Sequence, residues 1–228
     1  MDIKLWMEQF LNVMKGTFGG RLACVGLQGS RGRGEGGAAS DIDVVVILDR
    51  LTMEDLDSYR AAVADLPQRE LLCGFVSGRG ELACWDAADL FQFYHDTTPY
   101  LGSLDFLLPR ISGESIRRAV HLGACNIYHA CCHNYVHERE TEILKSCCKS
   151  AFFILQAKHY LETGMYTARK ADLLPQLAGA DREILAALLA EEFETRFAKL
   201  TGLLMEWSSG LIRQGTCGGR RQASAARG

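Results

Sequence analysis

The chain has 228 residues, of which 48% are hydrophobic and 23% are charged, so it can bury a core in one large domain or in two smaller ones. Its 25 basic and 28 acidic residues give a net charge of −3, which argues against a protein that wraps nucleic acid. No segment approaches the run of about 20 apolar residues that a membrane-spanning helix needs. We therefore expect a folded protein whose partner is neither a membrane nor a nucleic acid.

The nine cysteines do not fit a disulfide framework, because their number is odd and the chain is long. The segment from Met1 to Met14 is interrupted by charged residues and lacks the apolar core of a signal peptide. No Cys-x-x-Cys pair occurs, which argues against a zinc ribbon. We expect a reducing, cytoplasmic location in which most cysteines are small buried hydrophobic residues.

The first half of the chain alternates helical and strand-like patterns. Apolar residues recur at helical spacing from Ile3 to Met14, and the β-branched run after Asp41 is typical of a buried strand. In chain order, the expected elements are a helix that ends near Gly16, a strand over 22–28, a glycine-rich loop over 29–39, a strand over 41–48, a helix over 52–66, a strand over 71–76, a helix over 86–94 and a strand over 103–108. This alternation predicts a mixed α/β sheet.

The second half, after Pro109, has a helical pattern with short connections, which indicates antiparallel packing as a bundle. The expected helices cover residues 115–136, 141–162, 169–177 and 181–207. The end of the chain is rich in Gly, Ala and Arg, which favours disorder. The predicted parts are a mixed-sheet domain over 1–111, a helical bundle over 112–212 and a disordered tail over 213–228.

The segment from Gly29 to Asp43 carries the clearest chemistry. Glycine lets backbone N–H groups approach an anion closely, and the hydroxyl of Ser30 adds a donor. Asp41 and Asp43 open a strand, where alternation places both carboxylates on one face and turns Ile42 into the core. Two neighbouring carboxylates repel each other unless a cation lies between them, and hard oxygen ligands suit Mg²⁺, which binds phosphates. The pattern predicts phosphoryl or nucleotidyl transfer.

This segment resembles the signature of the DNA polymerase β-like nucleotidyltransferase superfamily, in which Gly-Ser, a spacer and Asp-x-Asp follow one another. The likeness is closest to its small kanamycin nucleotidyltransferase-like and minimal nucleotidyltransferase branch. The residues that fit at the expected spacing are Gly29, Ser30, Arg33, Gly34, Glu35, Ser40, Asp41, Ile42 and Asp43. The chain departs from the pattern at Arg31-Gly32, where relatives carry a small or aromatic pair, and its spacer is unusually rich in glycine and alanine.

The resemblance implies an α+β fold: an N-terminal mixed-sheet nucleotidyltransferase domain, which is catalytic, followed by an all-α bundle. It implies Mg²⁺ as cofactor, with ATP as the default nucleoside triphosphate. Asp41 and Asp43 would bind the metal and the nucleotide, and Gly29 and Ser30 would hold the triphosphate. Arg33 would add positive charge there or would pair with a neighbouring glutamate.

The resemblance also implies a third carboxylate on a neighbouring strand, as a metal ligand or a base. Asp105 is the candidate for this catalytic and metal-binding role, because it alternates with apolar neighbours as an inward-facing acid on a short strand would. The rivals lie on or near the preceding helix and are Asp86, Asp89 and Asp96.

The predicted bundle carries a periodic stripe of residues on its first helix. The members recur every four residues and are His121, Cys125, His129, His133 and His137. Such a stripe is typical of a semi-polar packing surface, with contacts to a substrate or a transition-metal site as alternatives. Lys145 and Lys149 lie one turn apart on the next helix and favour a solvated face over a phosphate contact.

The predicted function is Mg²⁺-dependent transfer of a nucleoside monophosphate, AMP from ATP by default, to an acceptor hydroxyl. Antibiotic-like small molecules are one acceptor class. The alternative is an antitoxin-like minimal nucleotidyltransferase that modifies or binds a protein partner. A binding module without turnover is a third reading, which the intact pair of acids disfavours. The acceptor, the base preference and the oligomeric state stay open, with a homodimer as one option.

Overall fold

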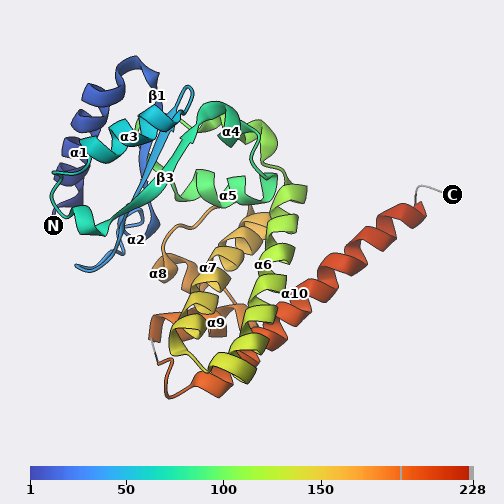
Figure 1. Cartoon of the computed structure of the whole chain (residues 1–228). Coiled ribbons are helices and arrows are strands. Elements are labelled where there is room, and N and C mark those ends of the chain that lie inside the picture. Colours follow the sequence, from blue (N-terminus) through green and yellow to red (C-terminus); the bar gives the residue numbers. More distant parts are fainter. Residues whose placement is uncertain (191, 226–228) are drawn as a thin grey trace. The chain divides into compact units, whose positions relative to one another are not determined.

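The computed structural model describes residues 1–190 and 192–225, with side chains as far as residue 214. The chain divides into two compact units, Met1–Ile111 and Ser112–Gly228 (Figure 1). No helix in the described part of the chain is long and apolar enough to cross a membrane.

The first unit is built around a four-stranded mixed sheet. Its strands are β1 (Leu22–Gln28), β2 (Ile42–Leu48), β3 (Leu72–Gly78) and β4 (Thr98–Gly102). The order across the sheet is β3-β2-β1-β4, in which β2 pairs parallel with β3 and β1 pairs antiparallel with both of its neighbours. Its helical elements are α1 (Ile3–Phe18), α2 (Gly29–Gly32), α3 (Met53–Ala62), α4 (Arg79–Ala83), α5 (Ala87–Asp96) and the 3₁₀ turns η1 (Gly19–Arg21), η2 (Arg69–Leu71) and η3 (Asp105–Arg110).

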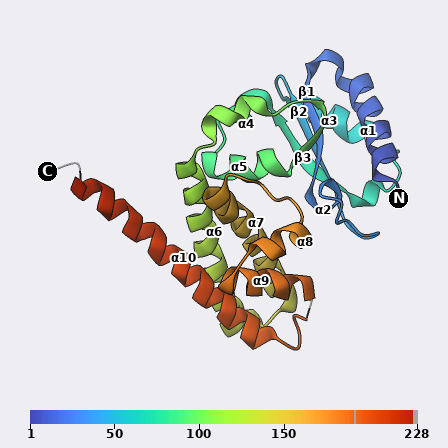
Figure 2. The same ribbon diagram turned by 180° about the vertical axis from the view of Figure 1, so that it is seen from behind.

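Each face of this sheet is covered by helices, because its central strands are apolar on both sides (Figures 1 and 2). Val44 and Val46 of β2 pack with α1 and α3 in one core. Val45 and Ile47, which alternate with them, pack with α4, α5 and η3 in a second core on the opposite face. The odd-numbered residues of β2, which include Asp43, therefore face the α5 side of the sheet.

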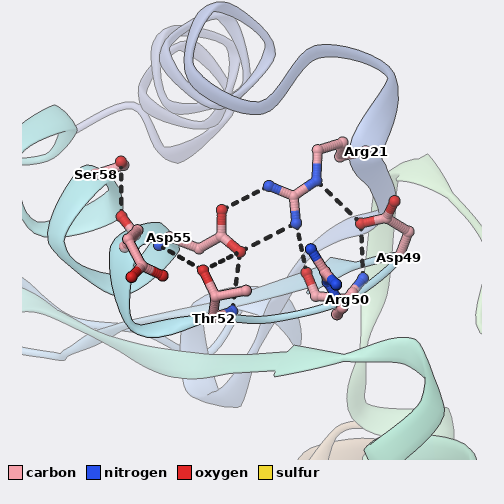
Figure 3. Close-up of polar contacts among 7 residues, drawn as sticks. Arg21, Asp49, Arg50, Thr52, Asp55 and Ser58 are labelled. Atoms are coloured by element: carbon pink, nitrogen blue, oxygen red, sulfur yellow. Dashed lines mark hydrogen bonds and ion pairs between the residues drawn. The ribbon is translucent and has the colours of Figure 1, made fainter.

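An ionic network holds Arg21, just before β1 begins, against the segment that follows β2 (Figure 3). Arg21 donates to both carboxylate oxygens of Asp55, at 2.6 and 3.0 Å, and to Asp49 at 3.2 Å. Asp55 also forms a capping box with Thr52 at the start of α3. The hydrogen bond from Arg21 lowers the pKa of Asp55 to about 2. This network stabilises the sheet at the end of β2 away from Asp43.

The second unit is wholly helical in the residues that the structure describes. Its elements are α6 (Gly113–His133), the π-helical turn η4 (Asn134–Glu138), α7 (Thr141–Thr163), α8 (Lys170–Leu173), the 3₁₀ turn η5 (Leu174–Gln176), α9 (Gly179–Ala190) and α10 (Phe197–Ala225). Helix α6 packs against α7 and α10 around a core that includes Phe152, Leu155 and Leu204. The predicted α+β fold, a mixed sheet followed by helices, is confirmed.

Several predicted elements differ from the structure. The fourth strand is Thr98–Gly102, and the predicted strand over 103–108 is largely η3, where Leu104 and Leu107 are buried at 3₁₀ spacing. The predicted helix over 181–207 is two helices, and Phe193, in the turn between them, is buried in the bundle core. Helix α10 continues to Ala225 instead of ending before a tail at residue 213, since extending an existing helix is easier than starting one. Residues 226–228 of that predicted tail lie outside the described residues.

Candidate active site

Strand β1 ends in a tight turn that brings Gly29 against Asp43. Gly29 has a φ of 70°, in the left-handed region that favours glycine. A Cβ added at Gly29 would collide with the Asp43 carboxylate. Gly29 is therefore required twice, for its backbone conformation and for the close approach of the carboxylate.

The two predicted metal-binding aspartates lie on either side of a buried residue. Ile42 is fully buried on the α1 side of the sheet, Asp43 is half-buried on the opposite face, and Asp41 is exposed just before β2 begins. Burial raises the pKa of Asp43, and the negative charges of Asp41 and Asp96 raise it further. A cation beside Asp43 would relieve this crowding of negative charge.

A third carboxylate next to this turn belongs to Asp96, which the sequence placed only among the rivals. Asp96 ends α5, and its Oδ2 accepts a hydrogen bond from the Gly29 N–H at 3.1 Å. Its two oxygens also accept bonds from Nη1 of Arg33, at 2.6 and 2.9 Å. Burial raises the pKa of Asp96 despite the opposing effect of Arg33. Asp96 thus links α5 to the turn that carries Gly29.

Asp105 lies at the start of η3 and not on a strand. Its Oδ1 accepts a hydrogen bond from the Tyr94 hydroxyl at 3.0 Å, and both residues line a hollow of about 230 Å³ that also includes Ser103. Within residues 1–190 and 192–225, no group of three His, Cys, Asp or Glu side chains is placed to hold a metal. The structure therefore does not place Asp105 as a third metal ligand beside the two aspartates of the turn.

Strand β3, which pairs with β2, has no acidic residue opposite Asp43. Asp43 pairs with Cys73 of β3, and Ile42 pairs with Leu72. The rival Asp86 caps the N-terminus of α5, where it accepts a hydrogen bond from Ala88 N at 2.9 Å. Asp96 is therefore the acid that the tertiary structure adds to the turn.

Arg33 follows the second of its two predicted alternatives. Its buried guanidinium pairs with Glu35 at 3.2 Å as well as with Asp96. Its charge is thus engaged by two carboxylates of the protein. Ser30, by contrast, directs its hydroxyl to no hydrogen-bond partner within the described residues, although its carbonyl accepts from Glu35 N at 2.7 Å.

The residues of this turn fit a divalent metal of the Mg²⁺ type. Asp41 and Asp43 supply hard oxygen ligands. The pKa of Asp43 is raised by its burial and then by the neighbouring acids, whose negative charge a cation would offset. Mg²⁺ in proteins is bound through one or two carboxylates, with waters and substrate phosphates completing its shell. A pair of protein carboxylates is therefore sufficient for such a site.

The histidine stripe lies on α6 and η4. His129, His133 and His137 are exposed, and the rings of His133 and His137 are 4.9 Å apart between centroids. His133 also pairs with Glu138 at 3.3 Å, and His121 lies 3.8 Å from the sulfur of Cys125. Lys145 pairs with Glu142 and Lys149 is exposed, as a solvated helix face predicts.

The geometry of the turn agrees with a comparison against protein families. Residues 7–77 match the family model described as a nucleotidyltransferase domain. The matched segment runs from α1 into β3 and includes the turn at Gly29 and both aspartates. The chain thus contains a nucleotidyltransferase domain of the DNA polymerase β-like superfamily, as the Gly-Ser and Asp-x-Asp motif predicted.

Among solved structures, the chain is similar to the spectinomycin adenyltransferase AAD(9) from Enterococcus faecialis, whose crystal structure is described as holding ATP and spectinomycin. The TM-score is 0.54 at 15% sequence identity, and the match covers 92% of this chain and 99% of that chain. At this identity the likeness shows the fold, a mixed-sheet domain followed by helices. No curated protein matches the chain significantly.

Proposed function

We propose that this protein is a Mg²⁺-dependent nucleotidyltransferase that transfers a nucleoside monophosphate, AMP from ATP by default, to a hydroxyl group of a small acceptor. The observation that carries the proposal is the contact between the Asp43 carboxylate and the Gly29 turn, with Asp41 just outside the strand. A phosphate-binding turn in contact with a pair of carboxylates is the arrangement that nucleotidyl transfer needs.

Each residue of the turn has a role in this proposal. The Ser30 hydroxyl and neighbouring backbone N–H groups bind the β- and γ-phosphates, while Asp41 and Asp43 hold Mg²⁺. When bound, Mg²⁺ neutralises charge on the triphosphate and on the pyrophosphate that leaves. Asp96 and Arg33 keep the turn in place rather than contacting the reacting atoms, because they are paired with each other.

The transfer forms one bond and breaks one. The acceptor oxygen attacks the α-phosphorus, the bond from that phosphorus to pyrophosphate breaks, and the hydroxyl proton passes to a base. Asp105 is our candidate for that base, because its carboxylate lines a hollow with the hydroxyl groups of Tyr94 and Ser103. Asp96 is less suited to the role, since both of its oxygens already accept hydrogen bonds from Arg33 and one also accepts from the Gly29 N–H.

The acceptor class and the cellular location are the finer parts of the proposal. The likeness to AAD(9) spans nearly the whole length of both chains and so favours a small hydroxyl-bearing acceptor over the protein partner of a minimal nucleotidyltransferase. The eight cysteines whose side chains the structure describes are free of disulfides, which suits a reducing cytoplasm where ATP is abundant.

The test is an incubation of the purified protein with radiolabelled nucleoside triphosphates, Mg²⁺ and a panel of hydroxyl-bearing antibiotics that includes spectinomycin. We expect pyrophosphate release and label on a small acceptor, both abolished in Asp41→Asn and Asp43→Asn variants whose circular dichroism is unchanged. Label on a protein would instead support the antitoxin-like alternative. Normal turnover in either variant would remove the metal assignment.

A further inference from the structure

Arg31 follows Ser30 directly, yet its side chain does not point into solvent. The residue is 8% exposed, and all four of its side-chain hydrogen bonds go to main-chain carbonyls at the far end of the loop. Its Nε donates to the carbonyls of Ser40 and Asp41, at 3.0 and 3.2 Å. Its Nη2 donates to the Ser40 carbonyl at 2.7 Å and to that of Ala38 at 3.3 Å.

These bonds hold a stretch of backbone that the sheet does not hold. The β1–β2 pairing ends where Gln28 meets Asp43, and the β2–β3 pairing begins at Ile42, so Asp41 has no partner in either ladder. The guanidinium of Arg31 binds the Asp41 carbonyl instead. A planar, charged fork suits this task, since it binds several oxygen atoms in a fixed geometry.

The rest of the loop is packed around the stem of Arg31. A Cβ added at Gly36 would lie 2.6 Å from the Arg31 Cγ and 3.2 Å from its Cα, so only glycine fits there. The Ser40 hydroxyl accepts from Gly37 N at 2.9 Å, and the Ser40 N–H returns to the Gly37 carbonyl at 3.3 Å. The glycine-rich spacer is therefore a folded loop that encloses the arginine.

Arg31 differs from Arg33 in what it binds. Arg33 is paired with two carboxylates, whereas the hydrogen bonds of Arg31 go to neutral carbonyls, so its positive charge is not cancelled by a direct ion pair. That charge also acts on Asp43, whose pKa it lowers against the larger opposing effects of burial and neighbouring acids. One side chain thus acts on both predicted metal ligands.

We propose that Arg31 is a positioning residue that fixes the Asp41 main chain relative to the Gly29–Ser30 turn and thereby sets the affinity of the two aspartates for a divalent metal. The proposal rests on the proposed function for the identity of the metal and the nucleotide. Its structural part, the immobilisation of the loop over 36–41, is independent of any activity.

The variants are Arg31→Lys, which keeps the positive charge but loses the branched guanidinium group, and Arg31→Gln, which loses both. Arg60→Gln is the matched control, because the Arg60 side chain is 80% exposed and pairs with Asp57 in the preceding turn of α3. Thermal unfolding shows whether each variant folds, and Arg31→Lys keeps the test open should Arg31→Gln fail to fold.

Two measurements follow on the folded variants. Amide hydrogen exchange measures how often the loop opens. We expect exchange at residues 37–41 to be about tenfold faster in both Arg31 variants, because the hydrogen bonds from the charged guanidinium to the loop carbonyls are lost. Mn²⁺ binding in the presence of α,β-methylene ATP, followed by electron paramagnetic resonance, reports the site. We expect the Mn²⁺ dissociation constant to rise about 10- to 100-fold, as when residues that orient metal ligands are removed, and to change little in Arg60→Gln.

Unchanged exchange over residues 37–41 would overturn the proposal whatever the activity. Faster exchange with unchanged Mn²⁺ affinity would overturn its metal part. If the unmodified protein binds no Mn²⁺ with the analogue, the proposed function fails, and the exchange rates alone then decide whether Arg31 immobilises the loop.

Discussion

Replacing Gly29 by alanine separates backbone strain from damage to the candidate site. At a φ of 70°, any residue with a Cβ pays for the left-handed conformation, at roughly 1–2 kcal/mol of folding free energy. The new Cβ would also lie 2.9 Å from the Asp43 Cγ, where ordinary contacts begin near 3.4 Å. The carboxylate carbon must then retreat by about 0.5 Å, and its nearer oxygen by more.

Gly34 offers a matched control, because its φ is 73° and a Cβ added there would meet no atom within 4 Å. Both Gly29→Ala and Gly34→Ala should therefore lose the free energy that the left-handed conformation costs, and Gly29→Ala should lose somewhat more in urea unfolding because its Cβ also displaces the Asp43 carboxylate. Only Gly29→Ala should lose nucleotidyl transfer, by about 100-fold or more, since a misplacement of about 1 Å in a catalytic group costs that much.

The assay is label transfer at saturating Mg²⁺ and ATP, run beside urea unfolding of the same protein samples. The reasoning would be refuted by a Gly29→Ala variant with normal turnover, or by a Gly34→Ala variant that loses as much activity as Gly29→Ala. In the first case the contact with Asp43 has no role in the reaction. In the second, strain in the loop alone explains the loss.

Three further predictions address the network around the sheet and the acids of the first unit. Arg21 lowers the pKa of Asp55 from 3.8 to about 2, so the contribution of this ion pair to stability is complete above pH 4 and is lost as the pH falls toward 2. Asp55→Asn should therefore flatten the profile of unfolding free energy in urea between pH 4 and pH 2. Arg33→Met should lower the free energy of unfolding by about 3–5 kcal/mol, because it leaves the buried Asp96 carboxylate without its ion-pair partner. Adding Asp96→Asn to this variant should restore part of the lost free energy. Equal stability of the single and double variants would contradict this prediction. Asp105→Asn should lower kcat for label transfer by about 100-fold or more with little change in the KM for ATP, as expected for a base that acts on the acceptor, and an unchanged kcat would exclude it from that role.

The local part of the candidate site could be predicted from sequence because its members are close in the chain. Period-two alternation is a property of any strand, so it was enough to turn Ile42 inward and to place Asp43 on the other face, whereas Asp41 lies just before the strand begins. The Gly-Ser turn and the Asp-x-Asp strand are joined by a short loop, so their contact also followed from spacing. The α+β fold was predictable for the same reason, since periodic apolar patterns identify elements before their packing is known.

The tertiary structure decided which distant groups join that turn. Asp96 reaches Gly29 only because α5 ends beside β1, a meeting across 67 positions that no local pattern encodes. Asp105 was placed on a strand by its alternation with apolar residues, but β4 forms earlier, at Thr98–Gly102, and leaves Asp105 on a 3₁₀ turn. From the sequence, Arg31 was only a departure from the motif. Its role could not be predicted, because the carbonyls that it binds acquire their positions only once the loop has folded around it. Sequence therefore determined the chemistry of the turn, and long-range packing determined its supports, because main-chain carbonyls and buried ion pairs carry no signature in the order of residues.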